Sequence, residues 1–184
     1  MSPARRLLVA ALCVGGYLAM TSLPAVATSA TATLTGGTLG FVSAPASTGF
    51  NVTLTGLNQV VTSTQTFDVG DATGSGAGWN ITATSTAFTT GAKSLANTSV
   101  TVQAVPTIAC DSGASCTTAT NGTSYPYTLP AAATAPTATK IFNSAANTGL
   151  GNQTVTLVFS LAIPANAFAG SYSSTWTYTL VSGP

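Results

Sequence analysis

The C-terminal segment 172–184 constrains the fold more than any other stretch, because it alternates large side chains with threonines. Trp176, Tyr178 and Leu180 are separated from one another by single threonines. Side chains at positions i, i+2 and i+4 of a β-strand lie on one face of the sheet. We therefore predict a strand over 172–181 with one aromatic and aliphatic face and one threonine face.

Segments of the same kind recur at short spacing, separated by glycine, proline and other turn residues. The apolar run 155–163 is typical of a strand that is buried on both faces or crosses a core, and 130–139, with its two prolines, indicates a surface loop. The predicted strands are 31–42, 50–55, 60–69, 79–88, 100–105, 124–129, 140–143, 155–163 and 172–181. About eight or nine strands, without a helical pattern beyond the N-terminal segment, predict an all-β fold: a single antiparallel β-sandwich of jelly-roll or immunoglobulin-like type.

Residues 1–27 have the features of a secretory signal peptide. Arg5 and Arg6 precede the short apolar run 7–20, and Ala25 and Ala27 form a small-x-small cleavage site. The alternative is an uncleaved membrane anchor, but the run is short for a span of about 20 residues. We expect cleavage after Ala27, which leaves 28–184 as a single domain of the secreted protein.

The remaining chain is almost uncharged. Its charged residues are two lysines, Lys93 and Lys140, and three aspartates, Asp68, Asp71 and Asp111. Segment 28–184 therefore has a net charge of −1. Because there is no basic patch, nucleic acid and acidic lipid are poor partner candidates, and a neutral glycan or another protein fits better.

The residues that the chain lacks exclude the common catalytic systems, and a Ser/Lys hydrolase is the one alternative left, although neither Lys93 nor Lys140 lies in a Ser-x-x-Lys motif. The sequence contains no histidine, so neither a Ser/His/Asp nor a Cys/His system can be built. It also contains no glutamate, and three aspartates leave little choice for a carboxylate pair. Asp68 and Asp71 are interpreted as turn residues, since two carboxylates are too few for a calcium site. We expect neither an enzyme nor a metal or other cofactor.

Cys110 and Cys116 are predicted to form a disulfide after export. The alternative, a redox or metal-binding pair, lacks any histidine or neighbouring ligand. A disulfide that closes so short a loop contributes about 2 kcal/mol to the stability of the fold.

Two aromatic segments resemble the motifs of the WxL domain, a cell-wall-binding module of Gram-positive surface proteins. The first is Trp79-Asn80-Ile81, where the family has Trp-x-Leu. The second is the C-terminal strand, which matches the family's proximal motif at Tyr172, Thr177, Thr179, Leu180 and Pro184, with Trp176 and Tyr178 standing where the family has Leu and Trp. The resemblance implies non-covalent attachment to peptidoglycan beside other wall proteins.

Trp79, Trp176, Tyr178 and Tyr172 are the candidate ligand-binding residues. A planar ring can stack on the apolar face of a sugar, although a tryptophan in a β-sandwich is also a common core residue. For Trp79 and Trp176 both interpretations stand at this point, and the two tyrosines are expected at the solvated edge.

We predict a secreted module at the cell wall that binds peptidoglycan or another wall polysaccharide through the aromatic face of its last strand. The alternative is a structural protein that assembles with itself into a surface layer or fibre through strand edges, which a near-zero net charge favours.

Overall fold

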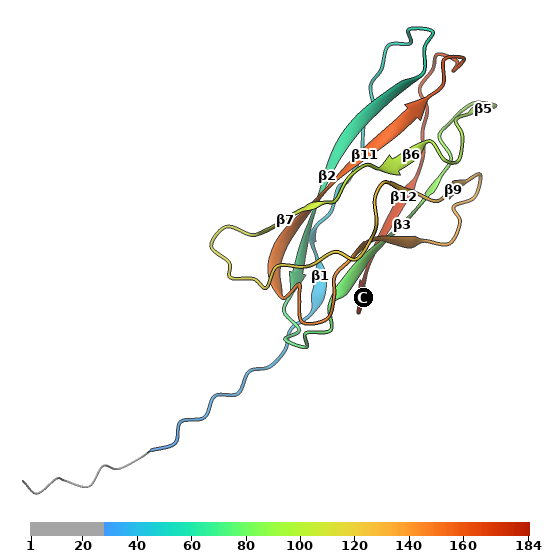
Figure 1. Cartoon of the computed structure of the whole chain (residues 1–184). Coiled ribbons are helices and arrows are strands. Elements are labelled where there is room, and N and C mark those ends of the chain that lie inside the picture. The colour runs from blue at the N-terminus through green and yellow to red at the C-terminus, as the bar shows by residue number, and fades with distance from the viewer. Residues whose placement is uncertain (1–27) are drawn as a thin grey trace, which may run out of the picture. The chain divides into compact units, whose positions relative to one another are not determined.

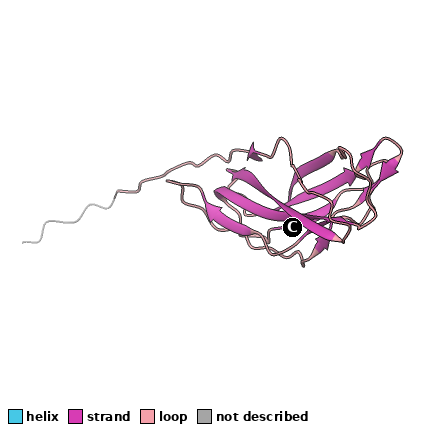
Figure 2. Cartoon of the chain, turned by 90° about the horizontal axis from the view of Figure 1, so that it is seen from above, coloured by secondary structure: helices cyan, strands magenta, loops and turns pink. Residues whose placement is uncertain are grey.

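The computed structural model describes residues 28–184, so the predicted signal peptide lies outside the described residues. Residues 28–34 are exposed and form no strand, whereas the compact unit 35–184 contains every strand of the described residues. The described residues form strands, turns and loops only (Figure 2). None of this part of the chain forms a helix of the length and hydrophobicity needed to span a bilayer.

The larger sheet is built on one long antiparallel pair, β2 and β11, which stay in register from Gln59 opposite Ile163 to Asp71 opposite Gly151 (Figure 1). Valine, threonine and phenylalanine dominate both strands and suit the pleated, half-buried surface of a sheet. The sheet has the order β1-β2-β11-β6-β8, and β7 pairs separately with β11. Its strands are β1 (Leu39–Ser43), β2 (Gln59–Asp71), β6 (Val100–Val102), β7 (Thr107–Cys110), β8 (Tyr127–Thr128) and β11 (Gly151–Ile163).

The smaller sheet has β3 at its centre, between β10 and β12, with the short β9 parallel to β3. A separate hairpin, β4–β5, follows β3. The strands are β3 (Trp79–Thr86), β4 (Thr89–Thr90), β5 (Lys93–Ser94), β9 (Ala131–Ala132), β10 (Thr139–Asn143) and β12 (Trp176–Ser182).

The core lies between the two sheets. Phe67 of β2 and Phe159 of β11 are fully buried from one side, and Trp79 and Ile81 of β3 from the other. Along β2 and β11 the alternate side chains, among which threonine is the commonest, lie on the outer face. This alternation of buried apolar and exposed polar positions confirms the predicted all-β sandwich.

Several local predictions differ from the structure: the predicted strands 31–42 and 172–181 begin only at Leu39 and Trp176, and the hairpin β4–β5 was not predicted. Segment 50–55 forms no strand, and the side chain of Gln59 is hydrogen-bonded to the backbone of Thr53 and Thr55. The predicted loop 130–139 contains the two-residue β9. β7 was not predicted, since four residues directly after a proline carry too little pattern to be recognised.

Candidate functional site

The aromatic face of β12 points into the sandwich, and its threonine face points outward. Trp176, Tyr178 and Leu180 are half-buried and pack against the core, whereas Thr177 and Thr179 are exposed. The alternation predicted for this strand is therefore present, but its aromatic rings do not form an outer surface.

Trp176 lies among three phenylalanine rings from different parts of the chain. Its ring centroid is 5.1 Å from that of Phe159 on β11, 6.2 Å from that of Phe50 and 6.3 Å from that of Phe88. Aromatic pairs at these separations stabilise a fold by about 0.5–1.5 kcal/mol each beyond the burial of their area. Trp176 therefore links the two sheets to segment 50–54.

Tyr178 joins the sheets through its ring and its hydroxyl. The ring packs edge-on against Phe67 at 4.8 Å, and the hydroxyl donates a hydrogen bond of 2.7 Å to Oε1 of Gln65, both on β2. Burial raises the pKa of the Tyr178 hydroxyl, so it stays protonated and acts as a donor at neutral pH.

Trp79 is a core residue. Its side chain is 0 % exposed, stacks on Phe142 with ring centroids 5.1 Å apart, and donates a hydrogen bond of 2.9 Å from Nε1 to the Gly149 carbonyl. Gly149 has φ +85°, and a Cβ there would collide with the Trp79 indole. Of the two interpretations of Trp79, the structure therefore supports the core and leaves no ring face for a ligand.

Tyr172 lies apart from these residues, at the side of a groove of about 510 Å³. We call it the aromatic groove. Its walls are the segments 50–54 and 167–172, and its floor is apolar. The floor residues are Phe88, Leu95, Leu161 and Ile163. The chain just after the first wall is hydrogen-bonded to the chain just before the second. The Ala165 amide donates a bond of 2.9 Å to Oδ1 of Asn58.

The rim of the aromatic groove includes residues that the sequence analysis did not single out. Phe168 is 59 % exposed, and the Lys93 ammonium lies 4.0 Å from its ring centroid. Phe50 forms part of the opposite wall, with Asn51 and Thr53 beside it. The alternation in 50–54 was the available signal for one wall, whereas nothing in the local pattern marked Phe168.

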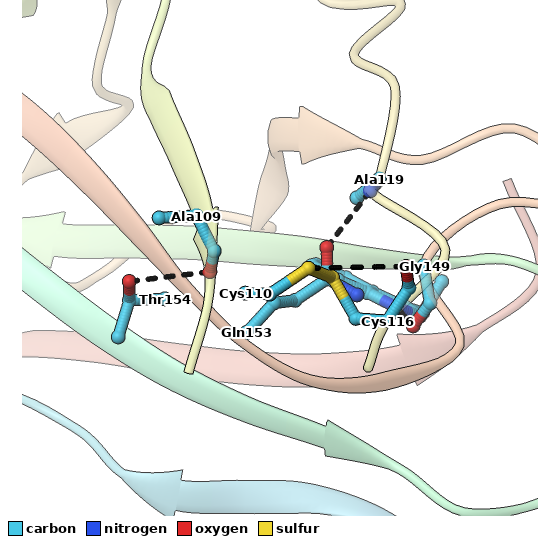
Figure 3. Close-up of a disulfide and its surroundings, with 8 residues drawn as sticks. Ala109, Cys110, Cys116, Ala119, Gly149, Gln153 and Thr154 are labelled. Carbon is cyan, nitrogen blue, oxygen red and sulfur yellow. Dashed lines mark hydrogen bonds between the residues drawn. A yellow bond between two sulfur atoms is a disulfide. The ribbon is translucent and has the colours of Figure 1, made fainter. Parts of the chain in front are cut away.

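The disulfide between Cys110 and Cys116 is present, with the two Cα atoms 5.6 Å apart (Figure 3). The chain after it is held by Gln153, whose Oε1 accepts a hydrogen bond of 2.8 Å from the Ala119 amide. Thr117 then accepts a bond of 2.7 Å from the Gly149 amide, so the stapled loop supports the glycine that holds Trp79. The bridge therefore has a structural role.

The acidic residues do not form a metal-binding cluster. Within 28–184, no three of the histidine, cysteine, aspartate and glutamate side chains come together. Asp71 accepts bonds of 3.0 and 2.6 Å from the amide and hydroxyl of Thr73, as a turn residue does. Asp68 instead lies within β2, close to Asp111, which corrects its prediction as a turn residue.

Comparison with known proteins gives one match. The family model described as WxL domain surface cell wall-binding matches residues 51–184. No curated protein matches the chain, and no solved structure does. The matched region includes both tryptophans, all four candidate ligand-binding residues and, except for Phe50, both walls of the aromatic groove.

Proposed function

The chain belongs to the WxL family of surface domains that bind the cell wall, and on that premise we propose that it attaches to peptidoglycan or another wall polymer through the aromatic groove. Family membership supports wall binding at the cell surface as its general role. The groove and the choice of polymer are our proposal.

The observation that carries the proposal is the composition of the groove. Apolar side chains form its floor, while Asn51, Thr53 and Ser171 place neutral polar groups on its walls. An apolar concavity with a few polar groups is the usual form of a ligand site. Tyr172 is the one candidate from the sequence analysis that lies directly in the groove, and Trp176 supports the groove through its contacts with Phe50 and Phe88.

Co-sedimentation with purified Gram-positive sacculi tests this proposal. We expect the chain 28–184 to sediment with the sacculi and Tyr172→Ala to bind about tenfold more weakly, because a ring in contact with the ligand is lost. Val60→Ala is the matched control, since Val60 is 63 % exposed and lies outside the groove.

A parent protein that stays in the supernatant would contradict wall binding. Equal binding by Tyr172→Ala and Val60→Ala, with both variants folded by circular dichroism, would move the site away from the groove.

Self-assembly is a second candidate function, favoured by the position of β12. This strand pairs only with β3 and ends its sheet, and an edge strand is a template for another chain. Light scattering of 28–184 without wall material would reveal oligomers or fibres if this function holds, and a monomer at high concentration would exclude it.

A further inference from the structure

We infer that the aromatic groove binds an extended peptide with small apolar side chains and a carboxylate, the chemistry of a peptidoglycan stem peptide, rather than a sugar ring. This inference rests on the proposed function and specifies which part of the wall polymer occupies the site. Three features of the groove support it.

The first feature is the largely aliphatic floor of the groove, where the single ring, Phe88, packs edge-on against Phe50 and Trp176. Trp79 is fully buried, and Trp176 and Tyr178 are turned inward onto phenylalanines. The floor is largely aliphatic, with Leu161 and Ile163 at the end of β11. Such a floor offers small apolar contacts suited to alanine side chains, whereas a sugar is best held on an open aromatic face.

The second feature is a strand-like wall without a neighbouring strand. Thr53 accepts a bond at its carbonyl from Gln59 Nε2 (3.0 Å), and the Thr55 amide donates to Gln59 Oε1 (3.3 Å). Backbone groups of successive residues in an extended chain point to opposite edges. We infer that those of Val52 point to the edge away from Gln59, where an extended peptide can add as a strand.

The third feature is the Lys93 ammonium, which lies beside the groove near Phe168. A hollow of about 180 Å³ adjoins the groove, shares Phe168 and Tyr172 with it, and has Lys93 in its wall. The three aspartates lie elsewhere, two on β2 and one directly after β7. The Lys93 ammonium, held over the Phe168 ring, is thus placed to bind a carboxylate of the ligand, which an uncharged glycan does not supply.

The decisive experiment compares intact peptidoglycan immobilised on beads with glycan strands, freed of their stem peptides by an amidase, immobilised on the same beads. We expect 28–184 to sediment with the first and to lose at least about tenfold in binding to the second, because the groove's backbone and charge contacts are both lost. A soluble stem peptide should compete with intact sacculi, and purified glycan strands should not.

Two pairs of variants locate the contacts. Val52→Pro removes an amide that has no partner in the sheets, and we expect it to weaken binding about tenfold, whereas Val52→Ala keeps the amide and should cost less than about threefold. Lys93→Gln should weaken binding roughly fivefold and Lys140→Gln should not, because Lys140 lies on β10 away from the groove. Equal urea midpoints for each pair would show that folding is unchanged.

The outcomes separate this inference from the proposed function. Undiminished binding to the immobilised glycan strands, or competition by soluble glycan strands alone, would overturn the peptide as the ligand and leave wall binding intact. Equal losses for Val52→Pro and Val52→Ala would overturn strand addition at this wall. Failure to bind any sacculi would overturn the proposed function itself.

Discussion

A tight fit at the level of single residues joins Gly149 and Trp79. The Gly149 carbonyl accepts the indole N–H, and the Gly149 amide donates to Thr117 in the loop after the disulfide. A buried indole N–H needs a partner, and here the partner is a backbone group that only a glycine can bring so close. One residue thus fixes both the core tryptophan and the stapled loop.

Gly149→Ala should destabilise the protein by at least about 2 kcal/mol, because its Cβ adds a collision to the cost of positive φ. Gly74→Ala is the matched control: Gly74 also has positive φ (65°), but a Cβ there meets nothing within 4 Å. We expect about 1 kcal/mol for that variant. Urea unfolding measures the free energy of unfolding of both variants. Equal losses would show that the contact between Gly149 and Trp79 adds nothing to stability.

Asp68 gives a pH dependence whose sign follows from its surroundings. Burial and then the neighbouring Asp111 carboxylate raise its pKa, and Oδ1 of each aspartate is buried without a partner. The folded protein therefore binds this proton more tightly than the unfolded chain does. Its contribution to stability is complete below the unfolded pKa of about 3.9 and is lost as the pH rises through the raised folded pKa.

Asp68→Asn should accordingly stabilise the protein at neutral pH and lose that advantage in acid. The amide cannot ionise, and its NH₂ group can donate to Asp111. Urea midpoints of parent and variant across this pH range check the prediction. A variant that is less stable than the parent at neutral pH would show that the Asp68 charge is compensated.

At the level of the element, β12 acts as a connector between the sheets. Its inward side chains reach Phe67 and Gln65 on β2 and Phe159 on β11. Its outward threonines extend the polar outer surface. The aromatic character of the strand is therefore explained by the core, and the ligand contacts that we propose lie in the segment that precedes the strand.

Tyr178→Phe should reduce stability by about 1–3 kcal/mol, since it leaves Oε1 of Gln65 without a partner and that residue is only 4 % exposed. Sacculus binding should not change. Tyr172→Phe removes a hydroxyl bond to the Phe168 carbonyl at an exposed site and should cost within about 0.5 kcal/mol. A loss of wall binding by folded Tyr178→Phe would place Tyr178 in the site after all.

At the level of the whole molecule, low charge governs the interactions with the wall. The described chain has two lysines against three aspartates, so long-range attraction to a charged polymer is weak. Shape, apolar contact and hydrogen bonding must supply most of the affinity. Lys93 is the single charge at the aromatic groove and its adjoining hollow.

Wall binding should therefore change by less than about threefold between about 0.05 and 0.5 M NaCl. Lys93→Gln should remove the residual salt dependence, because it removes the one charge at the groove. Sedimentation at several salt concentrations measures this. A steep loss of binding with salt in both proteins would show that charges outside the groove dominate.

Much of the fold follows from local pattern. The alternation in β2, β3, β11 and β12 reports which side chains share a face, because the pleat fixes a period of two. The signal-peptide pattern and the cysteine spacing can likewise be interpreted without knowing which residues lie nearby in the folded protein. The family resemblance at Trp79 and in the C-terminal strand was confirmed by the match over 51–184.

The sequence by itself determined the all-β class, the faces of the strands and the paired cysteines, since these depend on residues close in the chain. Only the tertiary structure decided which face of β12 is inside, that Trp79 is core, and that 50–54 has no strand beside it. These depend on what lies opposite each element, and segment 167–172 meets 50–54 across more than a hundred residues of sequence. The aromatic groove exists only through that meeting, so no local pattern could have revealed it.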